Sequence, residues 1–191
     1  FVFTGLTNGQ TYVFYVCANN SYGAGPVTSS NQIKPYTFQS LCGASTVTYT
    51  YNGASVTYGV VIGANYKCWL DRNLGATQVA TSSTDAASYG DLFQWGRGAD
   101  GHQLRTSTTT STLSTSDLPG NSNFILSSNP VYNYDWRNPQ NNNLWQGVSG
   151  VNNPCPSGFR IPTQDDFYYE YTNWNTPNSN GAFNSSLKIP L

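Results

Sequence analysis

Few side chains in this sequence could perform acid–base chemistry. The chain has one histidine, His102, and one glutamate, Glu170, and only 9% of its residues are charged. A serine hydrolase would need His102 as its base and a serine in a G-x-S-x-G turn, which the sequence lacks. The acids Asp165 and Asp166 could form a glycosidase pair only if they projected together, whereas consecutive helix residues point about 100° apart. The sequence therefore predicts a protein that is not an enzyme.

Patterns for cofactors and charged partners are also sparse. Four cysteines without C-x-x-C pairs and a single histidine do not provide a zinc site. Asn-rich loops could supply oxygen ligands to calcium, but no D-x-D-x-D-G loop supports such a site, so no cofactor is predicted. A net charge of -1 without a basic run disfavours nucleic acid as a partner. No apolar run approaches the ~20 residues of a membrane span, so no membrane insertion is predicted.

The segment 68–76, Cys-Trp-Leu-Asp-Arg-Asn-Leu-Gly-Ala, has the densest mixture of core-forming and charged residues. A tryptophan beside a cysteine is typical of core material. Partly buried charges are tolerable when they are paired, so Asp71 and Arg72 are predicted to form an ion pair at the edge of the core. We expect this segment to be structural rather than catalytic.

Several elements can be predicted around this segment. Alternating side chains over 12–18 and a run over 27–34 predict two strands, and Asn52-Gly53 between β-branched and aromatic runs predicts a hairpin. Residues 119–153 are rich in Asn, Gly and Pro and should form long loops pinned by aromatic residues. Thr163 is a suitable N-cap for a helix. The residues expected to form the buried stripe of that helix are Phe167, Tyr168 and Tyr171.

Residues 1–35 resemble the last strands of a fibronectin type III domain. Leu6 and Tyr12 are similar to its tyrosine corner, and residues 18–23 are similar to its turn between the last two strands. Such a sandwich needs about seven strands. The missing strands would come from upstream residues or from another chain, and we expect a strand of a neighbouring copy to dock in a groove formed by Tyr12, Phe14 and Val16.

Strand alternation also bears on the first cysteine. If Tyr12, Phe14 and Val16 face the core, then Cys17 points outward, where Cys42 is well placed to meet it. A Cys17–Cys42 disulfide is one prediction. A free thiol and an intermolecular bond are the alternatives.

Residues 42–191 resemble the Fibrobacter succinogenes major paralogous domain, a module of secreted and surface proteins. The motifs that carry the resemblance are Cys42-Gly43, Cys68-Trp69 through Leu74, Gly90-Asp91 through Gly96, and Cys155-Pro156 through Thr163. The stretch 158–163 is also similar to the C-type-lectin and formylglycine-generating-enzyme folds. The resemblance implies a loop-rich domain that stops before the family's last strands, and it implies a Cys68–Cys155 disulfide at the domain centre.

The predicted fold class is therefore α+β and β-rich, with a partial immunoglobulin or fibronectin-like sandwich over 1–37 and the paralogous domain over 38–191. Low charge, disulfides and abundant Ser, Thr, Asn and Gly favour an extracellular, cell-surface location. The sequons at Asn19 and Asn184 predict surface positions and possible glycosylation. We expect a structural subunit of a bacterial surface filament, with copies of itself as partners. The alternative is an adhesin module that binds surface glycans through exposed aromatic residues.

Overall fold

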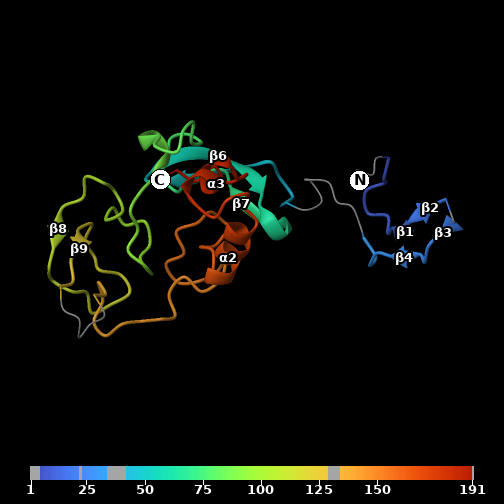
Figure 1. Ribbon diagram of the computed structural model, residues 1–191. Coiled ribbons are helices and arrows are strands. Elements are labelled where there is room, and N and C mark those ends of the chain that lie inside the picture. The colour runs from blue at the N-terminus through green and yellow to red at the C-terminus, as the bar shows by residue number, and fades with distance from the viewer. Residues whose placement is uncertain (1–4, 22, 34–41, 129–133, 191) are drawn as a thin grey trace. The chain divides into compact units, whose positions relative to one another are not determined.

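The computed structural model describes residues 5–21, 23–33, 42–128 and 134–190 (Figure 1). The chain divides into two units, Phe1–Ala44 and Ser45–Leu191, which are described separately below. Small sheets and two helices in the described residues are compatible with the α+β class. No helix in those ranges is long and apolar enough to cross a membrane.

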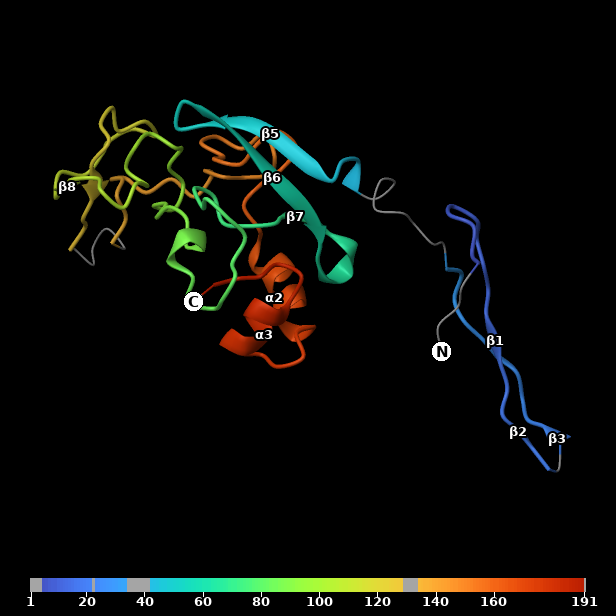
Figure 2. The ribbon, with the colours of Figure 1, turned by 90° about the horizontal axis from the view of Figure 1, so that it is seen from above.

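The first unit contains a narrow antiparallel ribbon (Figure 2). Its four short strands are Tyr15–Val16 (β1), Asn19–Asn20 (β2), Gly23–Ala24 (β3) and Thr28–Ser29 (β4), with β1 paired to β4 and β2 paired to β3. Tyr12 and Ile33 extend the ribbon through two backbone hydrogen bonds of 2.8 and 2.9 Å. The two predicted strand regions thus form the two sides of one ribbon.

The second unit contains an antiparallel sheet in the order β5-β6-β7. Its strands are Thr46–Tyr51 (β5), Ala54–Ile62 (β6) and Cys68–Leu70 (β7), and a 3-10 turn at Ala64–Tyr66 (η1) joins the last two. Asn52 and Gly53 have φ angles of 48° and 77°. A two-residue turn with positive φ at both positions matches the twist of the flanking strands, so the predicted hairpin is confirmed.

The predicted ion pair between Asp71 and Arg72 is also confirmed. Arg72 donates from Nε to Oδ1 of Asp71 at 2.7 Å and from Nη2 to Oδ2 at 3.0 Å. Its guanidinium lies 4.8 Å from the ring centre of Tyr58. The Tyr58 hydroxyl accepts from the Gly75 N–H and donates to the Ala76 carbonyl, so the ion pair and the following turn pack against the same strand.

The helix expected after Thr163 is Gln164–Thr172 (α2), and a second helix is Ser179–Asn184 (α3). Thr163 accepts a hydrogen bond from the Asp166 N–H, while Asp166 accepts one from the Thr163 N–H. This reciprocal capping box satisfies two N–H groups that a helix start leaves free. The predicted N-cap is confirmed.

The predicted buried stripe of α2 is wrong. Phe167, Tyr168 and Tyr171 are all exposed, and the buried residues of α2 are instead the acids Asp166 and Glu170. Asp166 forms ion pairs with Lys67 and Arg160. The helix therefore turns its paired carboxylate toward the rest of the unit, because these cations compensate the cost of burying the charge.

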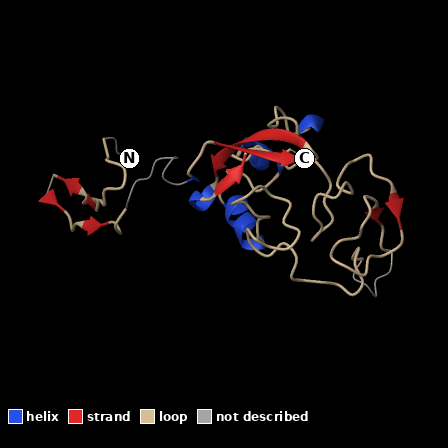
Figure 3. Ribbon diagram, turned by 180° about the vertical axis from the view of Figure 1, so that it is seen from behind, coloured by secondary structure: helices blue, strands red, loops and turns tan. Residues whose placement is uncertain are grey.

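Loops dominate the second unit between a 3-10 turn at Ala86–Ser88 (η2) and α2 (Figure 3). Thr109–Thr110 (β8) and Phe124–Ile125 (β9) form a short parallel pair, so part of the stretch 106–112, which consists only of Ser and Thr, has regular structure. Ile125, Trp136 and Leu144 make a buried cluster that anchors these loops. The expectation of loops pinned by aromatic residues is confirmed for Trp136, whereas Tyr134 is exposed.

The predicted cysteine pairing is wrong. Cys42 is bonded to Cys68, and Cys17 and Cys155 carry free thiols. In the antiparallel order β5-β6-β7, the outer strands both begin at the same end of β6, so the residues before β5 and at the start of β7 meet there. Neither the Cys68–Cys155 nor the Cys17–Cys42 bridge forms. The free Cys17 thiol matches one of the two alternatives.

Candidate functional site

The residues predicted to form a strand groove lie on the ribbon of the first unit. Tyr12 and Phe14 are half-buried, and Val16 is 60% exposed. The Tyr12 hydroxyl accepts a hydrogen bond of 2.8 Å from the Thr7 N–H. This contact back to an upstream backbone group is the kind that a tyrosine corner makes.

Large apolar side chains on this ribbon are solvent-exposed. Tyr15, in β1, is 71% exposed, and Val27, which directly precedes β4, is 61% exposed. Among the described residues, no further strand pairs with the outer edges of β1 to β4. The ribbon thus presents apolar side chains and free strand edges together.

His102 is not available as a general base in this structure. Its ring is fully buried; its Nδ1 lies 2.6 Å from Oδ1 of Asp100, and its Nε2 accepts a hydrogen bond of 3.0 Å from the Gln94 N–H. The imidazole is therefore the tautomer that carries its proton on Nδ1, and the lone pair on Nε2 already accepts the hydrogen bond from the Gln94 N–H. Burial lowers the pKa of His102, an effect that the hydrogen bond to Asp100 only partly offsets.

Arg97 completes this buried polar cluster, which the sequence did not reveal. It is fully buried and donates to the Asp100 carboxylate, to Gln94 Oε1 and to the carbonyls of Asn121 and Asn123. One guanidinium thus holds a distant loop in place through backbone atoms. The only sequence signal was an arginine between two glycines near Asp100.

A polar hollow lies beside the two helices and is called here the α2–α3 hollow. Its volume is about 510 Å³, within the range of roughly 300–1,000 Å³ that small-molecule sites occupy. Its lining includes Glu170, Asn173, Trp174, Thr176, Asn180 and Asn184. No cationic side chain belongs to this lining.

Glu170 is the unusual member of this lining. The side chain is 2% exposed, and its Oε1 is buried without a hydrogen-bond partner, as are Nε1 of Trp69 and Nε1 of Trp174. The Trp69 indole lies near this carboxylate but is not aligned for a hydrogen bond to Oε1. Burial raises the pKa of Glu170, and the Ala64 N–H and the Trp69 indole only partly offset this effect. The sequence marks Glu170 as the sole glutamate but predicts no role for it. Its signal was a lone glutamate four residues after Asp166, on the same helix face.

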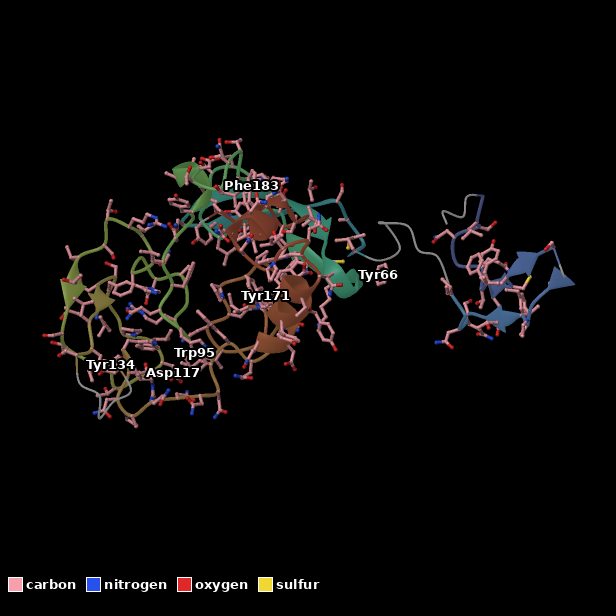
Figure 4. All side chains as sticks on the ribbon, viewed as in Figure 1. Tyr66, Trp95, Asp117, Tyr134, Tyr171 and Phe183 are labelled. Carbon is pink, nitrogen blue, oxygen red and sulfur yellow. The ribbon has the colours of Figure 1, made fainter. Side chains whose placement is uncertain are left out.

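A second hollow, about 460 Å³ in volume, is lined in part by Trp95 and Tyr134, which are labelled in Figure 4. These rings are 45% and 65% exposed. They are the exposed aromatic side chains that the glycan-binding hypothesis requires.

Two further predicted site residues are the asparagines of the sequons. Asn184 is exposed, as predicted, and lines the α2–α3 hollow. Asn19 belongs to β2, and its side chain lies outside the described residues. Within the described ranges, no group of three or more His, Cys, Asp or Glu residues could hold a metal ion.

A comparison of the sequence with protein families, with curated proteins and with solved structures finds no match. The resemblances to the fibronectin type III domain and to the Fibrobacter paralogous domain therefore stay predictions.

Proposed function

We propose that this chain is a non-enzymatic structural subunit of an extracellular bacterial surface filament. In this proposal, the ribbon of residues 5–33 is part of a fibronectin-like sandwich that a strand of a neighbouring copy completes. The second unit is a loop-rich domain of the C-type-lectin kind that decorates the filament. The observation that carries the proposal is that the ribbon has no charged residue and exposes apolar side chains, and that no further described strand pairs with its outer edges.

Stability arguments support completion by further strands. A two-stranded ribbon is marginal in water, and three or more strands with a shared apolar face are needed for independent stability. Tyr15 and Val27 are mostly exposed here. Burying a large apolar side chain stabilises a structure by roughly 1.5–3 kcal/mol, so covering these side chains with an added strand would favour its binding to the ribbon.

The charge pattern supports strand addition from another molecule. Proteins protect free strand edges with charged side chains, proline or bulges, because such edges pair readily with other chains. Residues 1–33 contain no charged residue at all, and Pro26 is their only proline. This ribbon therefore lacks the usual charged barrier against edge-to-edge pairing.

The geometry of donation supports a filament. When a strand leaves one copy and docks on the next, the two surfaces in contact differ, so the contact repeats as an open chain unless its rotation closes a ring. The disulfide between Cys42 and Cys68 is consistent with assembly outside the cytoplasm, where such bonds persist.

Cys17 allows a direct test, because its thiol is free and exposed on the ribbon. A thiol-reactive photo-crosslinker is attached to Cys17 of the natural full-length protein, in a Cys155→Ser background, using a mixture of isotopically light and heavy chains. We expect crosslinked peptides that combine light and heavy sequences, and filaments in electron micrographs.

Two lysine substitutions provide the controls. Val16→Lys places a charge in the groove and should abolish both the mixed crosslinks and the filaments. Gln10→Lys adds the same charge in an exposed turn of the same unit and should leave them unchanged. Crosslinks found only within single chains, together with a monomer at high concentration, would overturn the proposal in favour of a sandwich completed by the same chain.

A further inference from the structure

We propose that the α2–α3 hollow binds a neutral saccharide unit, with Glu170 and Trp174 as its anchoring polar groups. This inference goes beyond filament assembly, because it concerns a site on the second unit and needs no contact between copies. It also gives the glycan-binding alternative a defined place in the structure.

The first step of the argument is the unmet hydrogen-bonding capacity of the hollow. Nε1 of Trp174 is buried without a partner, and so is Oε1 of Glu170, although the Ala64 N–H and the Trp69 indole lie beside this carboxylate; Glu170 and Trp174 both belong to the lining. Leaving a buried polar atom unpaired is costly, so such atoms call for an explanation in an unseen ligand or water. One of them accepts and the other donates, which matches a hydroxyl, since a hydroxyl does both.

The second step concerns how the Glu170 carboxylate is held. A Cβ atom on Gly63 would lie 2.0 Å from Oε1 of Glu170 and 2.6 Å from Nε1 of Trp69. Only glycine at this position leaves room for the carboxylate and the indole. Glu170 also belongs to the lining of the hollow, so its side chain is held between Gly63 and the space that a ligand would occupy.

The third step is the chemistry of the remaining lining. Asn173, Asn180 and Asn184 contribute amides, and the other polar members of the lining are hydroxyl side chains and Asn175. The Asn184 amide already donates to Oδ1 of Asn180 at 2.9 Å, which orients this pair. Amides and hydroxyls pair with the donors and acceptors of a sugar ring.

The fourth step is charge. The lining has a single carboxylate and no cation, so a phosphate or carboxylate ligand would meet only repulsion. A site built for a multivalent cation would need several carboxylates. A neutral polyhydroxylated ligand fits both facts.

The test uses the full-length protein and a panel of methyl glycosides and N-acetylhexosamines, with ethanolamine as a cationic probe. Binding is followed by tryptophan fluorescence, since Trp174 lines the hollow, and by saturation-transfer NMR on the sugars. We expect at least one sugar to bind the protein. Glu170→Gln should weaken it about tenfold to a hundredfold, as expected for the loss of one charge-assisted hydrogen bond.

Matched variants make the result specific. Asp165→Asn removes an exposed acid from the same helix and should bind like the wild type. Asn180→Ala should weaken binding because it removes the partner of Asn184. Glu170→Gln keeps the size of the side chain and removes a charge that burial disfavours, so its fold is expected to survive, and the unfolding transition checks this.

Three results would overturn the inference: binding of ethanolamine without any sugar, no binding of any sugar in the panel, or equal affinity in the wild type, Glu170→Gln and Asn180→Ala. Filament formation is measured in the same samples. Loss of sugar binding in Glu170→Gln filaments would separate this site from assembly, so each proposal can fail without the other.

Discussion

Replacing Arg97 by lysine should strongly destabilise the second unit. The Arg97 guanidinium spreads its donors over a carboxylate, a side-chain amide and two backbone carbonyls, at distances from 2.7 to 3.1 Å. A lysine ammonium is a compact point charge, and it cannot reach all these acceptors from one position. At least two of them would stay buried without a donor.

The size of the effect follows from these contacts. A hydrogen bond to a charged group contributes about 1.5–3 kcal/mol, and breaking a buried charge pair typically costs about 3–5 kcal/mol. Arg97 is fully buried, whereas the Asp100 side chain is 31% exposed, so solvent can replace only part of the lost contacts. We expect Arg97→Lys to lower the free energy of unfolding by roughly 3–5 kcal/mol, within the range of such buried charge pairs.

Urea titration followed by tryptophan fluorescence is a suitable assay, because all five tryptophans lie in the second unit. Arg105→Lys is the control, since Arg105 is exposed and donates from Nε to a single carbonyl, that of Gly90. The control should change the free energy of unfolding by less than about 0.5 kcal/mol. A cost below about 1 kcal/mol for Arg97→Lys, or equal costs for both variants, would refute the reasoning.

Three further predictions concern pH, the helix cap and the thiols. Burial lowers the pKa of His102, so as pH falls the unfolded chain takes up a proton on this residue before the folded chain does. The free energy of unfolding should therefore decrease as pH falls below about 6.5. Urea titration of the wild type and of His102→Asn across pH isolates the contribution of His102 to this decrease. Asp166→Asn should lower the free energy of unfolding by about 2–3 kcal/mol in the same titration, because it weakens two ion pairs and the helix cap. Asp165→Asn, at an exposed position, should change it little, and equal changes in the two variants would contradict this reasoning. Mass mapping after alkylation of the native protein should find Cys17 modified quickly and Cys155 slowly, since burial raises the pKa of the Cys155 thiol to about 11; rapid modification of both would contradict this.

The features that the sequence determined by itself depend on neighbouring residues. The Asn52-Gly53 turn needs two residues that accept positive φ, and Thr163 caps its helix through a group three residues away. The pair of Asp71 and Arg72 is adjacent in the chain. In each case the interaction is local, so the residue types and their spacing were enough to predict it.

The tertiary structure decided which distant groups meet. Cys68 pairs with Cys42 because of the strand order, which residue spacing does not encode. The buried face of α2 is set by the cations that meet Asp166, so its aromatic residues remain exposed against expectation. Glu170 stood out in the sequence only as the sole glutamate. Its unpaired oxygen beside a hollow results from helix packing against Gly63, because burial and hydrogen-bond partners are properties of the folded chain.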